Sequence, residues 1–154
     1  MEVNHMPISD YCLGEVVTIG PSESIVAAAL LMRNHQVGCL VVVEGNKPVG
    51  ILTDRDIVRG VVAADVDPEL IQVEDVMTSD LITARQNAGV FDVISTMCGE
   101  GVRRLPVIDE EGHLVGIIAL DDLLMLLGTE LVNLASISTT ERHREKEKVK
   151  VAEA

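Results

Sequence analysis

The chain has 154 residues, of which 47% are hydrophobic and only 1% aromatic, and its formal net charge at pH 7 is −13. Such an acidic chain is unsuited to nucleic acid or an anionic membrane as its main partner, because both are polyanions. With one Tyr, one Phe and no Trp, it also lacks an aromatic platform for stacking single-stranded nucleic acid. No apolar run reaches about 18 residues and no signal-like segment opens the chain, so we expect a cytoplasmic protein that does not bind membranes.

The cysteines indicate the redox environment. Cys12, Cys39 and Cys98 are odd in number and far apart in the chain. This spacing fits neither a disulfide framework nor a metal knuckle, and it favours a reducing compartment. Cys39 lies in an apolar run, and we expect it to be a small core residue.

The first half of the chain predicts three short strands and two helices. Residues before Glu15 are expected to form a cap that leads into the first strand. A helix with its N-cap at Ser22 is expected to run to about His35, because Ile25, Ala29 and Met32 form one apolar stripe. A closing helix begins near Asp54. The predicted strands are Val16–Ile19, Cys39–Val43 and Pro48–Leu52.

The second half repeats the first. Val16–Val43 aligns with Leu81–Ile108 at a shift of 65 residues without a gap, and after one inserted turn residue the shift becomes 66. A match of this length indicates a tandem duplication. It predicts a second helix from an N-cap at Asn87 to about Glu100, a closing helix near Leu120, and strands at Leu81–Ala84, Leu105–Ile108 and Leu114–Ile118.

Each copy therefore has the order β-α-β-β-α, and one copy alone is too small to bury a satisfactory core. We predict an α/β (α+β) fold in which the two copies pack sheet to sheet with pseudo-two-fold symmetry. The charged tail from Thr139 onward is expected to be a solvated helix extension or disordered. The predicted boundaries are 8–66 for the first repeat, 67–77 for a linker with a short helix opened by Pro68, 78–135 for the second repeat and 136–154 for the tail.

The segment Gly50–Asp56 carries the most chemical information, because a strand ends and a helix begins there. Thr53 at the N-cap would place its hydroxyl beside free backbone N–H groups, a natural seat for phosphate, and Asp56 can accept hydrogen bonds from two ribose hydroxyls. The same Thr-x-x-Asp pattern also fits a capping box, in which both side chains satisfy only their own backbone. In the second copy Ala119 cannot cap, yet Asp122 is retained, which favours a ligand or a helix-dipole role.

Two arginines precede the central strand of the second copy. Arg103 and Arg104 stand where the first copy has Gly38 and Cys39. The arginines can clamp phosphate oxygens or, equally, pair with surface carboxylates. Gly38 would let a flat ligand approach the backbone closely.

The repeat resembles a cystathionine-β-synthase (CBS) domain pair, or Bateman module, over about residues 8–135. The resemblance rests on Cys39-Leu-Val-Val-Val and Gly50-Ile-Leu-Thr-Asp-Arg-Asp in the first copy, and on Arg103-Arg-Leu-Pro-Val-Ile-Asp and Gly116-Ile-Ile in the second. It implies two clefts between the repeats that bind an adenosine-containing ligand such as AMP, ADP, ATP or S-adenosylmethionine. Carried over, the first site comprises Asp56, Thr53, Ile51, Thr83, Val102 and Arg103, and the second comprises Asp122, Ile117, Thr18, Val37, Gly38 and Arg104.

The roles in these sites follow from the resemblance. Asp56 and Asp122 would hold ribose, Thr53 would hold phosphate, and Ile51 and Ile117 would line the base. Ala119 departs from the Ser or Thr that is usual in the family, which weakens the second site for a phosphorylated ligand or favours one without phosphate. We therefore expect one stronger site and one weaker or chemically different site.

No catalytic constellation stands out, because the histidines at 5, 35, 113 and 143 have no metal-ligand spacing. We expect a free-standing regulatory module rather than an enzyme, with no catalytic cofactor or metal, which signals to a protein partner when ligand binding closes the cleft. The alternative is a dimeric interaction scaffold without a working pocket. The resemblance also implies a homodimer, for which Ile25–Met32 and Leu123–Leu127 are candidate surfaces unless they are buried within the monomer.

Overall fold

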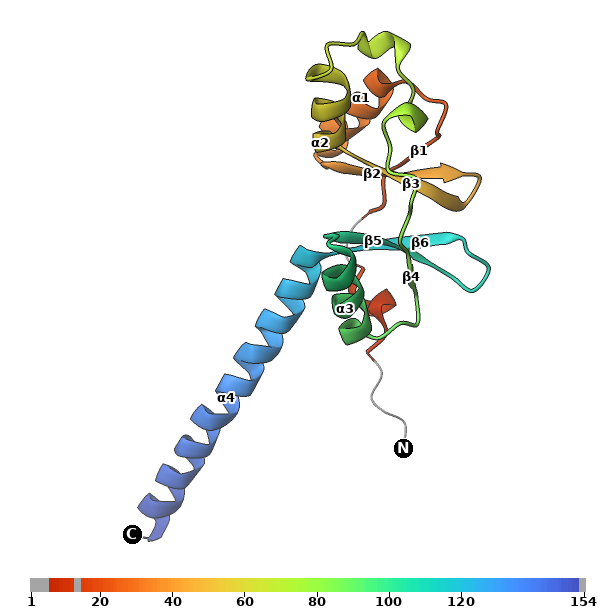
Figure 1. Cartoon of the computed structure of the whole chain (residues 1–154). Coiled ribbons are helices and arrows are strands. Elements are labelled where there is room, and N and C mark those ends of the chain that lie inside the picture. Colours follow the sequence, from red (N-terminus) through yellow and green to blue (C-terminus); the bar gives the residue numbers. More distant parts are fainter. Residues whose placement is uncertain (1–5, 13–14, 153–154) are drawn as a thin grey trace.

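The computed structural model describes residues 6–12 and 15–152. Two three-stranded sheets lie next to each other in the middle of the molecule, and the helices α1 and α2 cover one sheet while α3 and α4 flank the other (Figure 1). The predicted α/β fold of two similar repeats is confirmed. The hairpin turn of the first repeat touches the second, because the Leu114 N–H donates to the Asn46 carbonyl oxygen at 2.8 Å.

The two sheets have the same topology. Each pairs its first strand parallel to the second and its second strand antiparallel to the third. The first strand of each repeat is only two residues long and begins later than the sequence predicts. The strands are β1 (Thr18–Ile19), β2 (Cys39–Glu44), β3 (Lys47–Thr53), β4 (Ala84–Arg85), β5 (Arg104–Ile108) and β6 (Leu114–Ala119).

The two long helices inside the repeats end where the sequence predicts. They are α1 (Ile25–His35) and α3 (Val90–Glu100). The predicted N-caps are wrong by two residues, since the caps are Ser24, whose side chain accepts from the Ala27 N–H at 3.1 Å, and Gly89. A tertiary contact sets the start of α1, because the Ile25 N–H donates to the Ile71 carbonyl oxygen in the linker at 3.0 Å.

The other helices connect or close the repeats. The short helix predicted at Pro68 is present, and the charged tail is helical as far as residue 152, while 153–154 lie outside the described residues. The elements are η1 (Ile8–Tyr11), α2 (Asp54–Ile57), which continues as the π-helical η2 (Val58–Val62), η3 (Pro68–Leu70), η4 (Val73–Asp75) and α4 (Leu120–Ala152).

The segment before each first strand packs into the core of the other repeat. Ile8, which precedes β1, is 0% exposed in the core of the second repeat, and Val73, which precedes β4, is 0% exposed in the core of the first. Their backbones pair in matching ways, as the Ile8 N–H donates to the Ala88 oxygen at 3.0 Å and the Val73 N–H to the Glu23 oxygen at 2.9 Å. The segment before Glu15, which was expected to form a cap that leads into the first strand, therefore covers the core of the second repeat; its residues 1–5 and 13–14 lie outside the described residues.

The segments before β1 and before β4, which we call the exchanged segments, explain why glycine stands at two positions of the sheets. A Cβ at Gly116 would lie 3.2 Å from the Cβ of Cys12, and a Cβ at Gly50 would lie 2.5 Å from the sulfur of Met77. Each glycine therefore leaves room on the third strand for the segment that comes from the other repeat.

The long helix α4 changes the expectation about apolar runs. Within the described residues, the stretch Leu120–Glu145 is long and apolar enough, by length and composition, to cross a membrane, and only 6% of its most apolar window is buried in the protein. An unbroken apolar run of about 18 residues is still absent, because Asp121, Asp122 and Glu130 divide this stretch, so the sequence-based expectation did not anticipate a candidate span here.

Candidate functional site

The start of α2 is a closed capping box. The Thr53 hydroxyl donates to Oδ2 of Asp56 at 2.7 Å, and the Asp56 N–H donates back to that hydroxyl at 3.2 Å. Oδ2 of Asp56 also accepts from the Thr53 N–H at 2.9 Å. The capping alternative that the sequence left open is thus the arrangement that the structure shows.

The start of α4 keeps the half of this box that needs no hydroxyl. Oδ2 of Asp122 accepts from the Ala119 N–H at 2.9 Å. The inference that a carboxylate without a hydroxyl partner points to a ligand or a helix-dipole role was therefore incomplete, since the bond to the backbone alone gives Asp122 a structural role. Within the described residues, the second oxygen of Asp122 accepts no hydrogen bond, which leaves it open to a ligand.

A pocket of about 310 Å³ lies between the repeats and assembles most of the predicted second site. Five of the six residues predicted for that site line it, namely Asp122, Ile117, Val37, Gly38 and Arg104. The sixth, Thr18, is exposed on β1 and is absent from the lining. The sequence did not predict the other lining residues, which are Glu15, Val16, Val17, Gln36, Cys39, Val41 and Ala119.

Arg104 is the cationic group of this pocket. It begins β5 and pairs in the ladder with Ala119, three residues before Asp122, so the arginine and the carboxylate belong to one wall. Within residues 6–12 and 15–152, neither Arg103 nor Arg104 has a carboxylate partner within 4.0 Å. The pairing with surface carboxylates that the sequence held open is therefore not seen in the part of the chain that the structure describes.

Cys39 lines the pocket instead of filling the core, which corrects the sequence prediction. Burial raises the pKa of its thiol to about 11, with the charge of Arg104 opposing this rise and those of Asp56 and Asp54 adding to it. The thiol is therefore neutral at pH 7 and is a poor nucleophile. The charges of Asp56 and Arg104 both act on this thiol, so the first carboxylate also lies near the junction of the repeats.

The residues predicted for the first site lie on elements equivalent to those that carry the residues of the second site. Ile51 lies on β3, and its backbone pairs in both directions with Thr78, at 3.0 and 2.9 Å. The other half of the site comes from the second repeat, where Thr83 and Val102 are half-buried and Arg103 is exposed. No hydrogen bond among the described residues joins the Thr53–Asp56 box to these three residues, so their convergence on one ligand stays a prediction.

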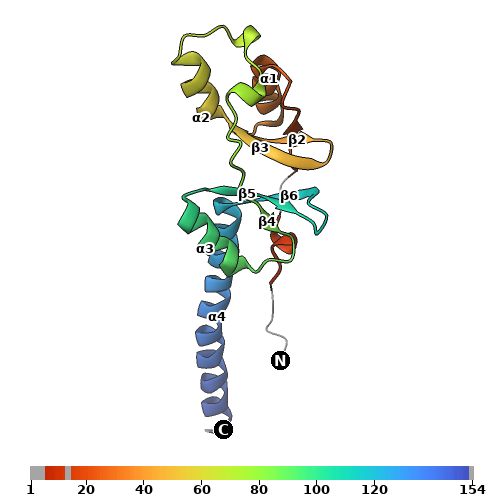
Figure 2. The same cartoon turned by 45° about the vertical axis from the view of Figure 1, so that its right-hand side comes forward.

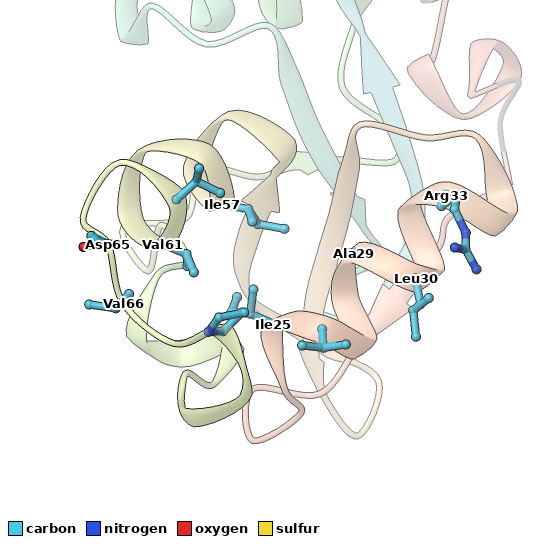
Figure 3. A pocket seen from close by; sticks show the side chains of 11 residues that line it. Ile25, Ala29, Leu30, Arg33, Ile57, Val61, Asp65 and Val66 are labelled. Carbon is cyan, nitrogen blue, oxygen red and sulfur yellow. The ribbon is translucent and has the colours of Figure 1, made fainter.

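Each repeat also has an apolar groove on its helical face. In the first repeat a groove of about 530 Å³ lies between α1 and η2, with Leu30 and Arg33 on one side and Val61 and Val66 on the other (Figure 3). A groove of about 420 Å³ occupies the matching place between α3 and α4. The runs proposed as dimer surfaces are therefore divided, because Ile25, Met32 and Leu123 are buried in the monomer whereas Leu30 and Leu124 are exposed and line the grooves.

One cluster of possible metal ligands was missed by the sequence analysis. The ligand atoms of Asp109, Glu111 and His113 lie within 4.8 Å of one another in the turn between β5 and β6. Asp109 also accepts from the backbone N–H groups of His113 and Glu111 at 2.8 and 2.9 Å, and the His113 bond is the main cause of its lowered pKa. This carboxylate therefore already fastens the turn. The alternate spacing of the three residues was the only signal in the sequence.

The comparison with known families identifies the repeat. Residues 8–63 and 73–129 match the CBS domain. The chain belongs to the CBS domain family. It carries a tandem pair of CBS domains, as the sequence motifs predicted.

Similar proteins agree with this assignment. The chain is 38% identical over 116 residues to the CBS domain-containing protein YhcV of Bacillus subtilis (strain 168), which covers 75% of this chain and 81% of that protein. It is 36% identical over 113 residues to the uncharacterized protein MK0525 of Methanopyrus kandleri, but this match spans only 58% of that protein's length and 73% of this chain.

Solved structures show the same fold. The CBS domain pair of protein MJ0100, crystallised in complex with 5′-methylthioadenosine and S-adenosyl-L-methionine, superposes with a TM-score of 0.73 at 28% identity. The match covers 82% of this chain and 98% of that one.

Proposed function

We propose that this CBS pair is a regulatory module, not an enzyme, and that it binds an adenosine-containing ligand in the pocket lined by Asp122 and Arg104. The single observation that carries the proposal is that this pocket gathers side chains of both repeats around Asp122 and Arg104, with the carboxylate of Glu15 also in its lining. Its volume of about 310 Å³ lies at the lower end of the range for small-molecule sites. The MJ0100 pair, which shares the fold, was crystallised with two adenosyl ligands.

Asp122 is suited to hold a ribose. The bond from the Ala119 N–H fixes one carboxylate oxygen at the start of α4, so the side chain is oriented before a ligand arrives. The other oxygen can then accept from neighbouring 2′ and 3′ hydroxyls. Val37, Gly38 and Ile117 supply the apolar walls for the base.

Arg104 favours an anionic ligand. Its guanidinium can bind phosphate oxygens in a bidentate fashion, and it replaces the hydroxyl that Ala119 lacks. At the first site, by contrast, a phosphate that uses the Thr53 hydroxyl must displace the 2.7 Å bond to Asp56. We infer that the pocket containing Asp122 is the stronger site and that the first site is weaker.

Signalling would follow from a shift in population. A ligand that touches both repeats binds best to the arrangement in which they are closed together, and its binding energy stabilises that state. The proposed readout is a change in the helical faces, where a second copy of the chain or a protein target in the cytoplasm can bind. The homodimer, the target and the cytoplasmic location are parts of this proposal.

A thermal-shift panel tests the ligand site. The wild type and the variants Asp122→Ala and Asp56→Ala are melted with AMP, ADP, ATP, S-adenosylmethionine, 5′-methylthioadenosine or NADH. At a concentration of 100 times Kd, a ligand stabilises by about 2.7 kcal/mol, which raises the Tm by roughly 5–10 °C. We expect Asp122→Ala to lose this shift and Asp56→Ala to retain most of it. The proposal fails if no ligand shifts the wild type, or if Asp122→Ala responds as the wild type does.

A substitution of Arg104 distinguishes phosphorylated ligands from ligands without phosphate. We expect Arg104→Gln to lower the affinity for AMP by tenfold or more, because a loss of about 1.4 kcal/mol of charge-assisted hydrogen bonding corresponds to a factor of ten in Kd. The same variant is expected to leave the affinity for uncharged 5′-methylthioadenosine within about twofold. Equal losses for both ligands would show that Arg104 does not act through phosphate.

A scaffold without a ligand is the second candidate function. The observation in its favour is that both carboxylates have structural bonds at the helix starts, so neither needs a ligand to explain it. On this reading no ligand of the panel moves the Tm, while the protein still captures its partner. Partner binding that is unaffected by nucleotide, together with a flat thermal-shift panel, would favour the scaffold.

A further inference from the structure

The last helix extends far beyond the repeat that it closes. α4 has 33 residues, and both views show it leaving the body of the molecule after its first turns (Figures 1 and 2). Leu123 is 2% exposed against the second repeat, whereas Leu124, Leu131 and Leu134 are 58%, 66% and 62% exposed. A helix that exposes this much apolar surface needs a partner.

The leucines of α4 form a regular seam, in which Leu124, Leu131 and Leu134 are exposed while Leu120 and Leu127 are half-buried. Leu120, Leu124, Leu127, Leu131 and Leu134 follow one another at alternating steps of four and three residues, and the pattern stops at Ser138. An average step of 3.5 residues is the period of a coiled-coil interface, not that of a straight helix packed on a globular core. We call these five leucines the leucine seam.

Although Leu120–Glu145 is long and apolar enough to cross a membrane, the exposed large apolar residues of α4 span a shorter stretch than a bilayer requires. The exposed apolar stretch Leu124–Ile137 has 14 residues, so it is about 21 Å long, whereas the hydrocarbon core of a bilayer is about 30 Å thick. Glu130 and Asn133 also interrupt this stretch. A protein surface, which tolerates such residues at the margin of an apolar seam, fits better.

We propose that the leucine seam is covered by a second copy of this chain, with the two α4 helices packed antiparallel. A heptad seam is self-complementary, so an identical helix provides the matching surface. With the pair centred near Thr129, Leu134 of one copy faces Leu124 of the other, and Leu131 faces Leu127. This inference rests on the homodimer of the proposed function and specifies its interface, but it does not depend on any ligand.

Charge decides the orientation. Residues 141–150 contain five basic and three acidic residues, whereas the whole chain has a net charge of −13. In a parallel pair the seam positions beyond Ser138 would bring Glu141, Glu145 and Lys148 against their own copies, and two acidic bodies would lie at one end. An antiparallel pair instead places each basic helix end beside the acidic body of the other copy.

The groove beside α4 extends the seam. Leu120, Leu124 and Leu127 line it together with Ile94, Met97 and Val102 from the neighbourhood of α3. In the antiparallel pair Leu131 and Leu134 of the second copy enter this groove of about 420 Å³. The second helix would therefore contact both α4 and the body of the second repeat.

Distances between spin labels test the pairing directly. His143→Cys is labelled in a Cys98→Ser background, and a sample without the new cysteine reports any labelling at Cys12 and Cys39. Since residue 143 lies about 14 residues from the centre, an antiparallel pair separates the two labels by about 40 Å. A parallel pair would hold them within about 25 Å, because paired helix axes are about 8–10 Å apart.

Matched substitutions identify the interface. Leu131→Asp with Leu134→Asp is expected to abolish the 40 Å distance, while Thr129→Asp with Ser136→Asp, which adds the same charge to the opposite face, is expected to retain it. Circular dichroism confirms that both double variants keep their helix content. A short distance, or no defined distance in the wild type, would overturn the proposal. Binding to vesicles of phosphatidylcholine and phosphatidylglycerol without a 40 Å distance would overturn it in favour of a membrane.

Discussion

Replacing Ile8 with alanine is expected to destabilise the second repeat, although Ile8 stands at the head of the first. The side chain is 0% exposed in the core of the second repeat. The change removes three carbon groups at about 0.8 kcal/mol each and leaves a cavity, so we expect the free energy of unfolding to fall by about 3–4 kcal/mol. This loss corresponds to a Tm lower by roughly 6–16 °C.

Urea unfolding gives the size of the loss, and amide hydrogen exchange locates it. We expect exchange to become faster first in α3, β5 and β6, because these elements surround Ile8. Ile8→Val is the matched control, with a cost of about 0.5–1.5 kcal/mol. Val73→Ala should produce the mirror image, with faster exchange in α1, β2 and β3. A cost below about 1 kcal/mol for Ile8→Ala, or faster hydrogen exchange confined to the first repeat, would refute the inference that Ile8 stabilises the core of the second repeat.

Three further predictions concern packing, titration and capping. Gly116→Ala should lower the free energy of unfolding by about 1–3 kcal/mol, because the new Cβ would lie 3.2 Å from the Cβ of Cys12. Gly128 lies on α4 in open space, so Gly128→Ala should instead raise the free energy of unfolding by about 1 kcal/mol. Urea unfolding of both variants tests these two values. In a variant without the other cysteines, alkylation of Cys39 should reach its half-maximal rate near pH 11. The free energy of unfolding should also fall between pH 9.0 and about 11, because only the native state keeps the thiol proton there, and Cys39→Ala should lack this fall. Asp56→Ala should cost about 1 kcal/mol in urea unfolding through loss of the box, and an unchanged midpoint would contradict its capping role.

The sequence by itself determined the features that depend on local pattern. The duplication, the ends of α1 and α3, and the hairpins between the buried strands are visible because apolar periodicity and turn residues act over a few positions. The same local patterns showed the resemblance to the family, and the resemblance in turn implied five of the residues that line the pocket between the repeats. The Thr53–Asp56 box was visible as one of two alternatives, since capping and ligand binding use the same oxygens.

Only the tertiary structure decided which distant segments meet. Nothing near Ile8 or Val73 in the chain shows that each completes the core of the other repeat, because that choice depends on how the two halves close on one another. The N-caps at Ser24 and Gly89 were missed for a related reason, as backbone bonds from the exchanged segments set where these helices begin. The place of Cys39 in the pocket wall likewise follows from the approach of the second repeat, which no apolar pattern within the first repeat records.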